Sequence, residues 1–113
     1  MRRPQQFRLV TREGQRAGGR TVSAHLLVVP DGESVKVGFI VSRAVGSAVV
    51  RNRVKRRLRE LVRARLADLP DGCLLVVRAH PVAADSRQAD LAADLDLVIG
   101  RLLRRQVGAL RQE

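Results

Sequence analysis

The chain has almost no aromatic residues: its 113 residues include two Phe and neither Tyr nor Trp. A hydrophobic core must therefore be built from Val, Leu, Ile and Ala, which are plentiful because 45% of the residues are apolar. With 29% charged residues, this composition is typical of a globular protein and not of a disordered one. The length predicts a single domain spanning residues 1–113.

Cysteine and long apolar runs are equally scarce. The single Cys73 excludes an internal disulfide and a multi-cysteine metal site, so we expect a reduced, cytoplasmic protein in which Cys73 is a small core residue. The alternative, a reactive thiol, needs a special local field. No apolar run follows Arg2 and Arg3, and no stretch approaches the roughly 20 apolar residues of a membrane span, so neither a signal peptide nor a membrane helix is predicted.

A catalytic centre is not predicted within this chain. Only His25 and His80 are available for acid–base chemistry, and nothing in the sequence brings them together. Asp90 and Asp94 share a predicted helix face and offer oxygen ligands to a metal, but they also suit the helix N-terminus and nearby Arg partners. No glycine-rich phosphate loop follows any predicted strand. We therefore expect no catalytic residue and no metal-ligating residue here.

What the chain does have is positive charge, and most of it lies in one place. The net charge is +11, and residues 43–65 alone hold nine basic and one acidic side chain, a net of +8. Such a concentration indicates a polyanionic partner. Arg outnumbers Lys by 20 to 2. Arg binds phosphate with two parallel hydrogen bonds and stacks on bases, although GC-rich codon usage also explains such a ratio.

The pattern of apolar residues predicts an α+β fold. We expect a helix over 4–13, strands over 21–29 and 35–42, a helix over 47–66, a strand over 73–79 and a helix from 86 or 87 to 110. The glycine-rich segment 14–20 is predicted to be a loop, and a turn over 30–34 is predicted to join its neighbours in a hairpin. The second strand, the basic helix and the third strand form a βαβ unit. The result is a small mixed sheet packed with helices, in the order α-β-β-(β)-α-β-α.

The helix predicted over 47–66 carries charge and an apolar stripe on opposite faces. At about 100° per residue, the apolar stripe comprises Val50, Val54, Leu58, Leu61 and Val62. The opposite face comprises Asn52, Arg56, Arg59 and Arg63. Only Glu60 can balance these charges, so repulsion among them lowers the stability of the fold unless an anion binds to this face. Polyanion binding is therefore favoured over a merely solvated face. An anionic membrane surface fits less well, because the stripe lacks aromatic anchors and is needed for the core.

These residues resemble a known family. The segment Gly38–Arg43, followed at this spacing by Arg51-Asn52-Arg53 within residues 46–60, resembles the protein subunit of bacterial ribonuclease P. The resemblance implies that the protein joins one large catalytic RNA, and that together they cut the 5′ leader from precursor tRNA. It implies that the RNA holds the Mg²⁺ ions and performs the hydrolysis, with no membrane and no obligate protein partner. It also implies a left-handed βαβ connection, as in a ribosomal protein domain of the same fold type, whereas about 98% of such connections are right-handed.

The resemblance also implies roles for individual residues. The residues implied to face the catalytic RNA are Arg43, Arg51, Asn52, Arg53, Lys55, Arg56, Arg57, Arg59 and Arg63. The residues implied to line a cleft for the single-stranded leader are Phe7, Arg8, His25 and Phe39. The alternative from another class is a non-enzymatic RNA-binding accessory module of the ribosome-associated type.

Overall fold

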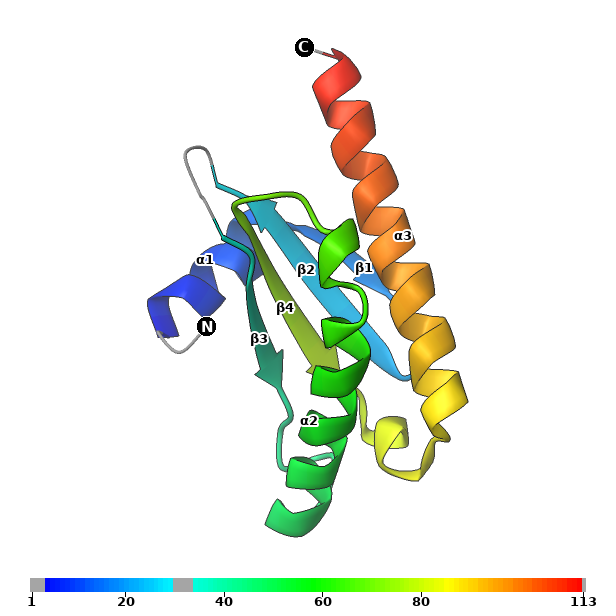
Figure 1. Cartoon of the computed structure of the whole chain (residues 1–113). Coiled ribbons are helices and arrows are strands. Elements are labelled where there is room, and N and C mark those ends of the chain that lie inside the picture. The colour runs from blue at the N-terminus through cyan, green and yellow to red at the C-terminus, as the bar shows by residue number, and fades with distance from the viewer. Residues whose placement is uncertain (1–3, 30–33, 113) are drawn as a thin grey trace.

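A mixed sheet with helices on both faces makes up the part of the chain that the structure, a computed structural model, describes: residues 4–29 and 34–112 (Figure 1). The helices are α1 (Pro4–Glu13), α2 (Ala48–Arg63) and α3 (Gln88–Gln112), and the strands are β1 (Gln15–Gly18), β2 (Val22–Val28), β3 (Lys36–Ile40) and β4 (Cys73–Ala79). Short 3₁₀ turns lie at Leu66–Asp68 and Pro81–Asp85. The α+β fold and most of the predicted elements are confirmed within two or three residues.

The strand order is β1-β2-β4-β3, which shows that the predicted hairpin is wrong. Strand β4 lies between β2 and β3, antiparallel to the first and parallel to the second. The reason is its composition: β4 is apolar and buried on both faces from Cys73 to Val77, so it belongs at the centre of the sheet and not at an edge. Residues 30–33 of the predicted turn lie outside the described residues.

The predicted loop over 14–20 is also wrong, because Gln15–Gly18 form a strand paired with β2. The chain passes directly from α1 into this strand at Gly14, whose N–H donates to the Val10 carbonyl at 2.8 Å. A Cβ at Gly14 would lie 2.5 Å from that oxygen and 2.8 Å from the Leu26 carbonyl oxygen. Glycine therefore permits a close approach of two backbones here, and does not mark an irregular loop.

The βαβ unit β3-α2-β4 is left-handed. Strands β3 and β4 are parallel neighbours and run downward in Figure 1, with α2 in front of the sheet and β4 to the right of β3. A right-handed connection would place β4 on the other side of β3 in this view. The structure thus agrees with the family resemblance and departs from the general preference.

The helices divide the sheet into two unlike faces. Helices α2 and α3 pack on one face over the main core, and α1 lies on the other over a smaller cluster (Figure 1). The buried residues of α2 are Val54, Leu58 and Val62, and those of α3 are Leu91, Leu95, Val98, Ile99 and Leu102. Cys73 is fully buried in the main core, as predicted. The sheet therefore separates the main core from a smaller cluster under α1.

Candidate nucleic-acid interface

Helix α2 is fixed at both ends. At its start, the Ser47 hydroxyl accepts a hydrogen bond from the Val50 N–H at 3.3 Å, which is the usual way in which serine caps a helix. Just beyond its end, Arg65 donates to both carboxylate oxygens of Asp96 on α3, at 2.5 and 3.1 Å. Arg65 also donates to the Leu61 carbonyl oxygen at 2.7 Å. The helix is therefore held against α3 while its outer face stays open.

The outer face of α2 carries a row of polar side chains, all of them basic except one asparagine, which we call the basic ridge. The basic ridge comprises Arg51, Asn52, Arg53, Lys55, Arg56, Arg57, Arg59 and Arg63. Asn52, Arg53, Arg56, Arg59 and Arg63 are exposed, and the other three are half-buried. Arg43, in the segment between β3 and α2, is exposed as well. The predicted division of the helix into a buried apolar stripe and an exposed basic face is confirmed.

The charges of the basic ridge are not neutralised from within the described part of the molecule. The ion pairs found in residues 4–29 and 34–112 join Arg12 to Glu13 and Arg65 to Asp96, and neither includes a ridge residue. Arg53 and Arg57 donate to the carbonyl oxygens of Ala84 and Ser86, at 3.5 and 3.3 Å. Carbonyl groups orient these guanidiniums but leave their charge in place. The ridge can therefore bind several phosphates at once.

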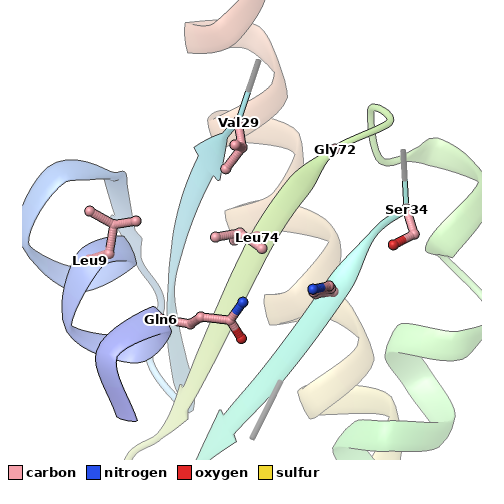
Figure 2. A pocket seen from close by; sticks show the side chains of 7 residues that line it. Gln6, Leu9, Val29, Ser34, Gly72 and Leu74 are labelled. Atoms are coloured by element: carbon pink, nitrogen blue, oxygen red, sulfur yellow. The ribbon is translucent and has the colours of Figure 1, made fainter. Parts of the chain in front are cut away.

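A cavity of about 300 Å³ lies on the opposite face, between α1 and the sheet (Figure 2). It is lined by Gln6, Leu9, Val29, Ser34, Lys36, Gly72 and Leu74. Phe7 is half-buried in the small cluster under α1, and Arg8 is exposed. Two of the residues predicted for the leader cleft therefore lie on the helix that borders this cavity.

His25 shares this face of the sheet with two arginines that sequence reasoning missed. Strand pairing sets Arg16 opposite His25, and Ser23 opposite Arg78. Burial, together with the positive charges of Arg16 and then Arg78, lowers the pKa of His25 from its ordinary value. Arg16 was missed because its strand was taken for a loop, and the only available signal was the alternation of four residues in β1.

Phe39 does not lie in this cleft, and its predicted place there is wrong. Its side chain packs toward the main core under α2, whereas Phe7 packs in the small cluster under α1. Side chains alternate between the two faces along β3, so Ile40 faces α1 while Phe39 faces α2. The chain's two aromatic rings are therefore separated by the sheet.

Of the remaining candidates for chemistry, Asp94 and His80 have structural partners, and Asp90 is exposed in the first turn of α3. Asp94 accepts hydrogen bonds from the Thr21 N–H at 2.7 Å and from the Thr21 hydroxyl, so it joins α3 to the start of β2. His80 Nδ1 lies 3.1 Å from the Arg20 carbonyl oxygen. Among residues 4–29 and 34–112, no group of three or more His, Cys, Asp or Glu side chains is placed to hold a metal ion. The described helices include none with the length and hydropathy needed to cross a membrane.

Comparison with known proteins places this geometry in a family. The chain is 52% identical over 101 residues to the ribonuclease P protein component of Nocardioides sp., covering 85% of this chain and 84% of the relative. It is 50% identical over 111 residues to the same component of Streptomyces griseus, covering 91% and 90%.

Solved structures share the fold at much lower sequence identity. The RNase P protein of Staphylococcus aureus matches with a TM-score of 0.79 and 21% identity, covering 88% of this chain and 91% of that one. The RNase P protein of Thermotoga maritima, in complex with 1-(4-fluorophenyl)-2-thiourea, matches with a TM-score of 0.76 and 22% identity, covering 90% and 95%. The family model for Ribonuclease P matches residues 1–103. On these grounds the chain belongs to the ribonuclease P protein family.

Proposed function

We propose that the chain acts as the protein subunit of ribonuclease P and binds the catalytic RNA of that enzyme through the basic ridge. The observation that carries the proposal is the row of guanidiniums on α2, which have no carboxylate partner among the described residues. Like charges one turn apart repel each other, so an arriving row of phosphates would relieve the repulsion. Asn52 adds a side chain able both to donate and to accept at a base edge or a 2′-hydroxyl.

The cleft under α1 would bind the 5′ leader of precursor tRNA. It lies on the face opposite α2, so the two RNAs would not compete for the same surface. Lys36 lines it, and Arg8 lies on the helix that borders it. Arg16 and Arg78 carry positive charge farther along the same face of the sheet, and Phe7 supplies the aromatic ring on this face. Because aromatic surface is small here, leader binding would depend mainly on the arginines and on backbone groups.

In this arrangement the protein contributes binding and charge neutralisation, while the RNA contributes the catalytic groups and the Mg²⁺ ions. Two polyanions, the catalytic RNA and the precursor tRNA, must approach each other. A subunit with a net charge of +11 reduces the electrostatic repulsion between them. The proposed site of action is the cytoplasm. An accessory module of the ribosome-associated type is not favoured, because the family match is to ribonuclease P.

Reconstitution tests the proposal directly. The protein is mixed with the cognate catalytic RNA and a 5′-labelled precursor tRNA, at a Mg²⁺ concentration too low for the RNA to act alone. We expect the protein to restore release of the leader, and the assembled enzyme to bind precursor tRNA more tightly than mature tRNA. An accessory module would bind both RNAs without restoring cleavage.

A further inference from the structure

A second recess lies on the α2 side of the sheet, next to the basic ridge. It has a volume of about 250 Å³ and is lined by Val37, Phe39, Arg59, Val62, Arg63 and Leu66. Strand β3 forms one wall because it is an edge strand, and the second half of α2 forms the other. We call this recess the β3–α2 groove. Drug-sized ligands usually occupy about 300–1,000 Å³, so the groove suits a smaller group.

The floor of the groove is apolar and partly open to solvent. Val62 is only 2% exposed, while Val37 and Phe39 are half-buried. Leu66, just after α2, is 39% exposed, which makes it one of the few large apolar side chains on the described surface. Phe39 is one of two aromatic residues in the whole chain. Its half-buried ring therefore offers a flat apolar surface in a protein that has almost none elsewhere.

The rim of the groove is cationic. Arg59 and Arg63 are both exposed and lie four residues apart, so they are neighbours on one side of the helix. Glu60 lies on the same helix, but no ion pair joins it to either arginine. An apolar floor with two guanidiniums beside it matches a nucleotide whose base stacks on the ring while its phosphates meet the arginines. A second copy of this chain fits poorly, because its own net charge of +11 would be repelled.

We infer that the β3–α2 groove takes one unpaired nucleotide of the catalytic RNA, with its base against Phe39. This inference rests on the proposed function. The groove shares Arg59 and Arg63 with the basic ridge and is separated by the sheet from the cleft under α1. Its occupant therefore belongs to the RNA that covers the ridge, and not to the leader. Within the holoenzyme, this contact would add recognition of one particular nucleotide, because phosphate contacts position the protein but carry no sequence information.

Substitution of Phe39 tests the inference. Phe39→Leu keeps an apolar side chain on the core but removes the flat ring, and Phe7→Leu makes the same change on the opposite face. We expect Phe39→Leu to weaken binding of the protein to the catalytic RNA about tenfold, with an unchanged salt dependence because no charge is lost. Phe7→Leu should leave that affinity unchanged. Equal affinity of wild type and Phe39→Leu would overturn the inference.

Ultraviolet cross-linking of the wild-type holoenzyme, followed by mass spectrometry, provides a readout that does not depend on any variant. We expect Phe39 to be linked to a single nucleotide of the catalytic RNA. A link to precursor tRNA, or to another protein molecule, or no link at Phe39 at all, would overturn the inference. In each case, wild-type binding and leader cleavage report separately on the proposed function, which stands if they are intact.

Discussion

Cys73 shows how strongly the sheet controls the chemistry of one residue. The thiol is fully buried at the start of β4, and burial raises its pKa from 9.0 to about 11. A thiol attacks as the thiolate, so both access and ionisation are suppressed in the folded protein. Cys73 is therefore the core residue that the sequence predicted.

The raised pKa predicts a loss of stability in alkali. Between pH 9 and 11 the unfolded chain loses the thiol proton while the folded protein keeps it, so the free energy of unfolding falls as pH rises through this window. The loss approaches about 2–3 kcal/mol for a shift of this size. Urea unfolding at a series of pH values measures it. In Cys73→Ala this component should vanish; an identical pH dependence in both proteins would contradict the prediction.

His25 predicts the opposite behaviour in acid. Its pKa is lowered by burial, Arg16 and Arg78, so the unfolded chain takes up the proton first as pH falls. The stability that the neutral ring contributes is complete above the ordinary pKa of 6.5 and is lost as pH falls below it. NMR titration should give a midpoint for His25 below 6.5, which Arg78→Ala raises.

If bound leader phosphates reach this face, precursor tRNA should also raise the midpoint of the His25 titration, whereas mature tRNA should not.

Helix α2 and the residues just after it carry arginines that serve two different purposes. Arg59 faces solvent, whereas Arg65 is held by Asp96 and by the Leu61 carbonyl group. The paired geometry lowers the pKa of Asp96, chiefly through the hydrogen bond from Arg65. Arg59 is therefore available to bind a partner molecule, whereas Arg65 is already held within the fold.

This difference predicts contrasting variants. Arg59→Ala should weaken binding to the catalytic RNA about fivefold and reduce the log–log salt slope by about 1, because one phosphate contact is lost. Its stability to urea should stay within about 0.5 kcal/mol of wild type. Arg65→Ala should lose about 1 kcal/mol of stability and leave the salt slope unchanged. Filter binding over a range of salt concentrations, with urea unfolding alongside, separates the two. Similar profiles for both variants would remove Arg59 from the RNA contact.

The elements also show what periodicity can and cannot predict. The buried stripe of α2 follows from local spacing and was predicted correctly. The partner of β3 was predicted wrongly, because strand pairing depends on segments far apart in the chain. Strand β4, which follows α2 in the sequence, lies between β2 and β3 where a hairpin was expected. The placement of Phe39 came from the family resemblance, and the alternation of side chains along β3 instead directs its ring to the α2 side. Strand β1 was missed because four residues carry too little pattern.

At the scale of the whole molecule, the sheet separates two binding surfaces. The basic ridge and the β3–α2 groove lie on the α2 side of the sheet, and the cavity under α1 lies on the opposite side. Under the proposed function, the first side meets the catalytic RNA and the second meets the substrate. Substitutions on the two sides should then have separable effects.

Phe7→Ala tests this separation from the substrate side. It should weaken binding of precursor tRNA to the holoenzyme about fivefold to tenfold, in line with the loss of one stacked base, and leave mature tRNA binding unchanged. Affinity for the catalytic RNA should not change. Because Phe7 is half-buried, unfolding curves must first show that the variant is folded. Equal losses for precursor and mature tRNA would place Phe7 outside the leader cleft.

The central position of β4 has a consequence for biosynthesis. Translation delivers α2 before the strand on which its underside packs, so β3 has no neighbour until residues 73–79 leave the ribosome. For that interval the nascent chain exposes an incomplete sheet and a strongly cationic segment, while the nearest polyanion is ribosomal RNA. Ribosome profiling and cross-linking of nascent chains stalled before Cys73 would find this segment on the ribosome surface, and release would follow once β4 completes the sheet.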